Sequence, residues 1–196
     1  MKSDYITVNI LDMIDAIGED ALISILSDFS CPKNLEIETF IKNKAIEFAK
    51  KKLSITYFVI DNHSGDILSV FSLTHKALDI NGNVLSATMR KKLSRFAQFD
   101  ERSNSYTVSA FLIAQFGKNY AVVQPCTWNG IRLMEKTFQT LEKVQREIGG
   151  GIVYLECEDN VALLDFYQND NNRFHVFSER YSDADNIKYI QLLRLF

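Results

Sequence analysis

Glycine and proline are scarce in this chain, which has 8 Gly and 2 Pro among 196 residues. This scarcity excludes collagen-like, low-complexity and disordered classes, whose sequences are rich in one or both residues. An excess of basic charge is missing too, since 22 Lys and Arg stand against 25 Asp and Glu. A dedicated nucleic-acid-binding domain is more often basic. Because 46% of the residues are hydrophobic, we expect one compact globular domain over residues 1–196.

Cysteines are few and scattered: Cys31, Cys126 and Cys157 form no C-x-x-C pair. Such a set favours a reducing compartment without a disulfide framework. The apolar stretch near the N-terminus is interrupted by acidic residues, unlike a signal peptide. No run is long and apolar enough to span a membrane. We therefore expect a cytoplasmic protein that does not bind a membrane.

Motifs of several common enzyme classes are missing. The sequence has no G-x-S-x-G, no G-x-x-x-x-G-K-[ST] and no G-x-G-x-x-G, so hydrolase, P-loop and Rossmann interpretations lose support. The histidines, His63, His75 and His175, have no Cys, His or Glu at ligand spacing on the same element. No metal site is therefore expected.

The chain does contain a succession of strand and helix patterns. The expected strands are 5–10, two strands of a hairpin within 55–78, 105–116, 151–157, 174–177 and 188–196. The expected helices are 11–28 with a break near Gly18, a helix from 35 into the early fifties with Asn34 as its N-cap, 83–99, 130–148 and 160–170. The unit 105–157 is a β-α-β crossover, whose two strands should be parallel. The fold class predicted is α/β, with a mixed sheet flanked by helices.

One strand–loop–helix stretch, 105–135, has the features of an anion site. The helix begins at Gly130, directly after a polar loop. The first N–H groups of a helix are unpaired and partly positive, and a glycine lets a phosphate approach closely. Asn129, Ile131 and Arg132 could donate further N–H groups, and Arg132 adds a charge. A purely structural alternative is an N-cap at Thr127 or Asn129 followed by a turn glycine.

Three segments taken together resemble the GNAT superfamily of acetyl-CoA-dependent N-acetyltransferases: VSAFLIAQFGKN, GIRLMEKTFQTLEKV and IVYLECEDNVALLDFY. In that family a long strand leads into a phosphate loop and helix, a parallel strand splays away, and the next helix ends in Phe-Tyr. The stretch FSCPKNLEIETFIKNKAIEFAKKKLSITYFVID, followed by ILSVFSLTHKAL, looks like the toxin-like branch, some of whose members are carried by mobile elements. The resemblance covers about residues 35–196 and implies a single GNAT-like domain with splayed central parallel strands, preceded by a lead-in at 1–34.

The resemblance implies an acetyl-CoA site. Phe116, Gly117 and Lys118 match the strand-end positions whose backbone pairs with the pantetheine arm. Gly130 matches the last glycine of the family's pyrophosphate loop, and residues 129–133 match the start of its helix.

Two further residues match positions near the reacting thiol. Asn160 matches a position that often contacts the cofactor, and Tyr167 matches the Tyr that commonly protonates the departing thiolate. A phenol can do this because it is a weak acid facing a strongly basic leaving group. The chain departs from the family in its loop, PCTWNGIR, which has one glycine and a Trp. It also has NDNNRF where Gly-Phe usually follows the Phe-Tyr helix.

The activity implied is direct acetyl transfer to an amine. A backbone N–H near Phe116 would stabilise the oxyanion of the tetrahedral intermediate. Glu156 and Glu158 end the strand 151–157, and period-two alternation places both on one face, opposite Leu155 and Cys157. Glu156 is the candidate base, acting directly or through a water molecule.

The acceptor is left open between a small amine, a protein amine and aminoacylated tRNA. For tRNA, the basic clusters Lys50–Lys52 and Arg90–Arg95 are candidates for phosphate contacts. The single glycine motivates an alternative in which a degenerate GNAT module binds a partner without catalysis. An antitoxin partner and a homodimer are left open as well.

Overall fold

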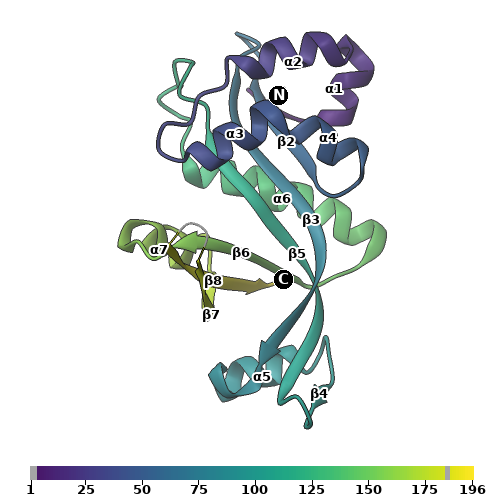
Figure 1. Cartoon of the computed structure of the whole chain (residues 1–196), viewed down its shortest axis with the longest axis vertical. Helices are drawn as coiled ribbons and strands as arrows, with labels where there is room; N and C mark the ends of the chain where they lie inside the picture. The colour runs from purple at the N-terminus through teal and green to yellow at the C-terminus, as the bar shows by residue number, and fades with distance from the viewer. Residues whose placement is uncertain (1–3, 184–185) are drawn as a thin grey trace. The chain divides into compact units, whose positions relative to one another are not determined.

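The computed structural model describes residues 4–183 and 186–196. Figure 1 labels its helices and strands along the chain. In chain order they are β1 (Tyr5–Asn9), α1 (Ile10–Ile17), α2 (Glu19–Ser27), α3 (Leu35–Asn43), α4 (Ala45–Lys50), β2 (Ile55–Asp61), β3 (Ile67–Asn81), the 3-10 turn η1 (Gly82–Val84), α5 (Ala87–Leu93), β4 (Phe99–Asp100), β5 (Ser105–Lys118), α6 (Gly130–Ile148), β6 (Ile152–Glu158), α7 (Val161–Gln168), β7 (His175–Ser182) and β8 (Ile187–Leu195).

The chain forms two compact units. The first comprises Met1–Thr74 and Ile113–Glu142, and the second comprises His75–Leu112 and Lys143–Phe196. Strands β3 and β5 and helix α6 therefore contribute residues to both. The strand order is β1-β2-β3-β5 in the first unit and β3-β5-β6-β8-β7 in the second, with β4 beside β5. That residues 1–196 form one domain stays a prediction.

The helices of the first unit begin and end where local chemistry favours it. Gly18 has φ +84°, a left-handed conformation that favours glycine, and it separates α1 from α2 as predicted. The side chain of Asn34 accepts a hydrogen bond from the Ile37 N–H, which confirms the expected N-cap of α3. The continuous helix predicted after residue 35 is wrong, because Lys44 has φ −127° and divides it into α3 and α4.

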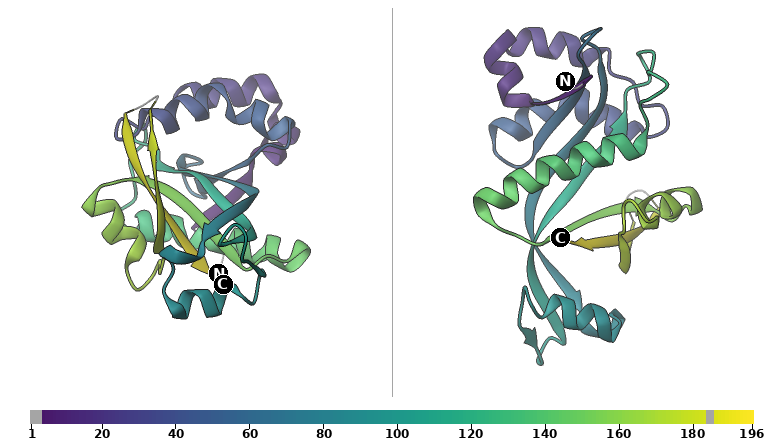
Figure 2. Two further views of the ribbon diagram at one scale, coloured as in Figure 1. Left: turned by 60° about the horizontal axis from the view of Figure 1, so that its bottom comes forward. Right: turned by 180° about the vertical axis from the view of Figure 1, so that it is seen from behind.

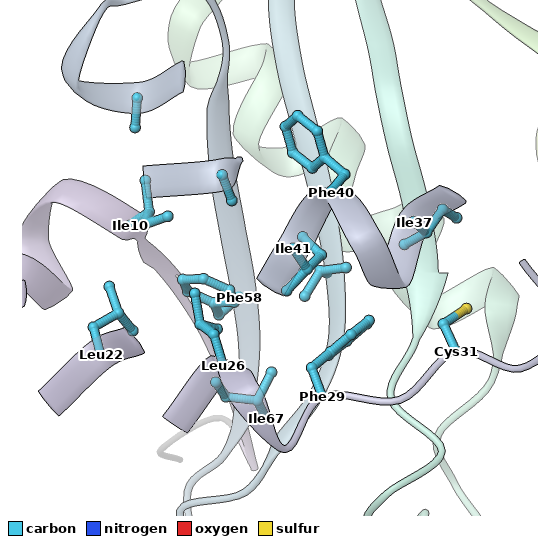
Figure 3. Packing of buried hydrophobic residues seen from close by; sticks show 13 residues of the cluster. Ile10, Leu22, Leu26, Phe29, Cys31, Ile37, Phe40, Ile41, Phe58 and Ile67 are labelled. Atoms are coloured by element: carbon cyan, nitrogen blue, oxygen red, sulfur yellow. The ribbon is translucent and has the colours of Figure 1, made fainter. Parts of the chain in front are cut away.

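Helices α1 to α4 enclose the apolar core of the first unit. In Figure 3 the side chains of Leu22, Leu26 and Ile41 converge on Phe58 of β2 and Ile67 of β3. Helix α6 lies on the other face of these strands from α3 and α4 (Figures 1 and 2). The strands of this unit are therefore covered on both faces by helices.

The second unit is built around the parallel pairing that the sequence predicts. Phe111 of β5 lies opposite Val153 of β6, and Leu112 lies opposite Tyr154. Beyond Leu112, β5 continues in the first unit, whereas β6 stays in the second. On its other side β6 pairs antiparallel with β8, so the last strand of the chain lies between β6 and β7.

Two element boundaries of the second unit differ from the sequence-based expectation. The helix predicted over 83–99 is shorter: Ser86 caps α5, which ends at Leu93, and Phe99 instead pairs with Tyr106 as part of β4. The closing hairpin is longer, because β7 extends through Ser182. The polar run of β7 hid its strand character, since these side chains are mostly exposed. The predicted connection across 179–187 includes residues 184–185, which lie outside the described residues.

Candidate functional site

The loop between β5 and α6 is fixed to the first residues of β3. Asn119 donates from its backbone N–H to Leu68 O at 2.8 Å and from its side chain to Ile67 O at 2.9 Å. Gln124 Nε2 donates to Leu68 O at 3.1 Å. Trp128 Nε1 donates to Ser69 Oγ at 2.8 Å. Three side chains spread over ten residues thus hold a loop without regular structure in one place.

Trp128 is a buried anchor of this loop. Its side chain is 3% exposed, and its ring lies 4.7 Å from the ring of Tyr5, centroid to centroid. The backbone N–H of Trp128 donates to Pro125 O at 2.9 Å, which closes a turn immediately before the helix. The indole ring is therefore buried in the core of the first unit.

Helix α6 begins at Gly130, as the sequence predicts. Asn129 caps it: its Oδ1 accepts from the Arg132 N–H at 3.1 Å. The expected donor Arg132 is thus already paired through its backbone, and its guanidinium lies 3.3 Å from Glu135 Oε2. Within the described residues, no partner accompanies the N–H groups of Gly130 and Ile131. Two helix-start donors therefore remain for an anion.

The end of β5 contributes Phe116, Gly117 and Lys118, all half-buried. Gly117 faces the α3 region, where an added Cβ would lie 3.2 Å from Ile37 Cδ1 and 3.5 Å from Cys31 Sγ. A larger residue would press on this contact, so glycine permits the close packing of strand and helix. The first unit thus holds seven of the ten predicted site residues: Phe116, Gly117, Lys118, Asn129, Gly130, Ile131 and Arg132.

The second unit holds the other three, beginning with Glu156 on β6. Burial acts to raise the pKa of Glu156, but hydrogen bonds from Arg180 and Gln191 and the positive charges of Arg180 and Lys76 outweigh it and lower the pKa. Glu156 is therefore ionised at neutral pH, and it is a weak base. The expected alternation holds, since Cys157 is buried while Glu158 is exposed.

Helix α7 carries Asn160 and Tyr167. Asn160 is its N-cap, and its Oδ1 accepts from the Ala162 N–H at 2.9 Å. Tyr167 is 7% exposed, and its ring meets that of Phe174 edge-on at 6.0 Å. Burial, followed by the proximity of Cys157, raises the pKa of the Tyr167 phenol well above its usual value. The phenol is therefore protonated throughout the neutral range, as a proton donor must be.

The segment after α7 ends the helix with a residue in the left-handed conformation and with side-chain hydrogen bonds. Arg173 adopts φ +54°, the left-handed conformation that glycine takes most readily, and Phe174 is fully buried. Asn169 and Asn172 each donate from their side chains to Phe166 O at 2.7 Å. The NDNNRF sequence thus closes the helix through asparagine side chains.

The two basic clusters differ in their counter-ions. Lys50 Nζ lies 2.9 Å from Glu19 Oε2, and Lys51 Nζ lies 2.5 Å from Glu47 Oε1. The charge of the cluster at 50–52 is therefore largely neutralised. The second cluster lies on α5 and directly after it. Its four side chains are exposed, and none forms an ion pair with another of the described residues; they are Arg90, Lys91, Lys92 and Arg95. These four charges stand together in a chain whose net charge is −3.

Several contributors could not be recognised in the sequence. Asn119 and Gln124 carry no motif, and only the position of the sole Trp in a polar loop hinted at an anchor. Arg180 lies on a strand that the pattern did not reveal. No group of three metal-ligating side chains occurs in residues 4–183 and 186–196. Over the same residues, no helix is long and apolar enough to cross a membrane.

Neither a family model nor a curated protein matches the sequence. Solved structures do match. AtaT complexed with acetyl-methionyl-tRNAfMet has a TM-score of 0.66 and 13% identity, over 98% of this chain and 95% of that chain. A tyrosine-to-phenylalanine mutant of KacT has a TM-score of 0.66 and 14% identity, over the same shares of the two chains. The NatC complex bound to Gag peptide and CoA has a TM-score of 0.51 and 15% identity, over 99% of each chain.

These likenesses define the class of fold. The chain has a GNAT-like fold, as in the structures of AtaT and KacT, which confirms the fold class expected from the sequence. At such low identity the comparison establishes the architecture, and the chemistry rests on the residues described above.

Proposed function

We propose that this protein is an acetyl-CoA-dependent N-acetyltransferase. The observation that carries the proposal is the start of α6 at Gly130, where the N–H groups of Gly130 and Ile131 have no partner within the described residues. A helix start of this kind attracts a pyrophosphate. A likeness to AtaTR bound with acetyl-CoA, with a TM-score of 0.59 and 14% identity over 98% of this chain and 93% of that chain, supports the same ligand.

Each residue then has a definite task. Backbone groups at Phe116, Gly117 and Lys118 hold the pantetheine arm, and the N–H groups at the start of α6 hold the pyrophosphate. Bound acetyl-CoA supplies the activated acetyl group. Glu156 accepts a hydrogen bond from the acceptor amine, and Tyr167 donates a proton to the departing sulfur. Asn160 is assigned to the neighbourhood of the thiol.

Cofactor binding is tested by thermal melts with and without acetyl-CoA. At 100 times Kd a ligand specific for the folded state adds about 2.7 kcal/mol, which for a chain of this size raises Tm by about 5–10 °C. Gly130→Glu should abolish the shift, because a carboxylate repels the pyrophosphate while suiting the helix dipole. Gln139→Glu, on the exposed side of the same helix, should retain it. No shift in the unmodified protein at millimolar acetyl-CoA would favour the non-catalytic binding module.

We further propose aminoacylated tRNA as the acceptor, because the α5 charges have no counter-ions among the residues that the structure describes. AtaT, of like fold, has been solved with acetyl-methionyl-tRNAfMet. Replacing Arg90, Lys91 and Lys92 by Gln should raise the KM for tRNA and flatten its dependence on salt, by about 0.7–0.9 in the log–log slope for each phosphate that the protein no longer neutralises. The matched control replaces Lys50, Lys51 and Lys52, whose charges are largely paired, and should change the slope little. Equal effects of the two triple variants would contradict this assignment.

A protein partner belongs to the same proposal. A mutant of the toxin AtaT has been solved bound to the C-terminus of the antitoxin AtaR. We propose that an antitoxin binds this chain and inhibits its acetyl transfer. Size-exclusion chromatography with light scattering distinguishes a monomer, a homodimer and a complex with another protein.

A further inference from the structure

Three polar side chains from neighbouring strands meet on one face of the second unit. Glu156 of β6 lies directly opposite Gln191 of β8 in the strand register. Glu156 Oε1 accepts a hydrogen bond from Gln191 Nε2 at 2.6 Å, and Oε2 accepts one from Arg180 Nη2 at 2.8 Å. Each carboxylate oxygen thus has its own donor, and the orientation of the group is fixed.

Arg180 reaches this carboxylate from β7, across the intervening strand β8. In the register Arg180 lies opposite Tyr189, and its guanidinium lies 5.0 Å from the centre of the Tyr189 ring. A guanidinium over an aromatic face is attracted by the ring and loses freedom of movement. The arrangement is therefore built by strand pairing, and it is more than a chance contact of long side chains.

This cluster lies on the opposite face of β6 from the buried thiol of Cys157, since alternate side chains of a strand point to opposite faces. Tyr167 lies near that thiol, since the electrostatic effect of Cys157 is one cause of its raised pKa. The Glu156 carboxylate and the Tyr167 phenol are therefore separate groups, one available to the nucleophile and the other to the leaving group.

We propose that Arg180 and Gln191 are positioning residues for acetyl transfer, which fix the Glu156 carboxylate so that it accepts a hydrogen bond from the acceptor amine. The inference rests on the proposed function. A carboxylate has about four acceptor positions, so two remain after Arg180 and Gln191. In the transfer, the amine nitrogen forms the C–N bond and the C–S bond breaks. Tyr167 gives its proton to the sulfur and regains one from water, while the amine loses its proton to water beside Glu156.

The side chain of Glu156 stays accessible among charged and polar neighbours. The groups near it are Arg180 on β7, Lys76 on β3, Tyr154 and Glu158 on its own strand, and Tyr189 on β8. The side chain of Glu156 is 27% exposed, so an amine can reach it.

The kinetic test uses acetyl-CoA and a pool of aminoacylated tRNA. Arg180→Gln should raise the KM for tRNA on the order of tenfold, since a hydrogen bond to a charged group is removed, and leave the KM for acetyl-CoA unchanged. In a Glu156→Gln background the same substitution should have no further effect, because Arg180 acts through Glu156. The control is Lys188→Gln, which removes a cation from the other face of the same hairpin, where Lys188 pairs with Asp159 and Glu179. It should change neither KM.

A second measurement does not depend on activity. The ¹³C carboxyl signal of Glu156 should titrate at a higher pH in Arg180→Gln than in the unmodified protein, and at an unchanged pH in Lys188→Gln. An unchanged titration in Arg180→Gln, or equal kinetic losses with and without Glu156, would overturn the positioning role. Absence of acetylation by the unmodified protein, with the titration shifted as expected, would instead refute the proposed function.

Discussion

The indole of Trp128 should determine both the stability of the first unit and the shape of the loop before α6. Its Nε1 donates to Ser69 Oγ at 2.8 Å, and its ring packs against Tyr5 with only 3% of the side chain exposed. Trp128→Ala removes a large buried side chain, a change that typically costs about 3–5 kcal/mol. Trp128→Phe keeps an aromatic ring and should cost about 2 kcal/mol, roughly half from the missing hydrogen bond.

The hydrogen bond can be isolated with a double-mutant cycle. Ser69→Ala leaves the indole N–H buried without an acceptor, which costs about 1–3 kcal/mol. Ser69 Oγ itself donates to Leu68 O at 2.7 Å, so the hydroxyl keeps one partner in Trp128→Phe. The cost of Ser69→Ala should therefore fall by about 1 kcal/mol in the Trp128→Phe background.

The assay is urea unfolding of the four proteins, followed by thermal melts with acetyl-CoA. The coupling should appear in the free energy of unfolding, and Trp128→Ala should also lose most of the Tm shift given by acetyl-CoA. Strict additivity of the two substitutions would refute the anchor. A full acetyl-CoA shift in a folded Trp128→Ala protein would refute its connection with the cofactor.

Three further predictions follow from burial and packing. Tyr167→Phe should lower kcat by about 10²–10⁴ without changing the KM for acetyl-CoA, as expected for a general acid, and unchanged turnover would exclude that role. Gly117→Ala should destabilise the protein by about 1–3 kcal/mol in urea unfolding, because its Cβ would lie 3.2 Å from Ile37; an equal cost in an Ile37→Ala background would point to another cause. Burial raises the pKa of Tyr167 above the value of 10.0 that it has when unfolded, so the unfolded chain loses this proton first. Stability should be full below about pH 10 and fall as the pH rises above it, less steeply in Tyr167→Phe, and parallel slopes in the two proteins would contradict the assignment.

Local signals predicted much of the fold. Gly18 and Asn34 mark helix boundaries through conformations and caps that depend on a few neighbouring residues, and both predictions are confirmed. The division at Lys44 and the early end of α5 carry no comparable signal. Phe99 follows a helical pattern in the sequence, yet pairing with Tyr106 draws it into β4. Tertiary pairing outweighs local preference at such positions.

The candidate site was predictable where it depends on one segment. Gly130 begins its helix as expected, and Asn160 and Tyr167 lie on the helix that the pattern indicates. The Arg180–Glu156 contact joins residues 24 apart and requires the register of three strands, which periodicity cannot give. Arg173 in a left-handed conformation was equally hidden, because a residue other than glycine gives no signal of it.

The most direct test of the account is mass spectrometry of the amino acids released from charged tRNA after incubation with the protein and acetyl-CoA. We predict that the amino acid gains one acetyl group on its α-amine, that free CoA appears in equal amount, and that Tyr167→Phe slows both. Charged tRNA left without an acetyl group, while acetyl-CoA binds or remains intact, would contradict acetyl transfer to an aminoacyl acceptor.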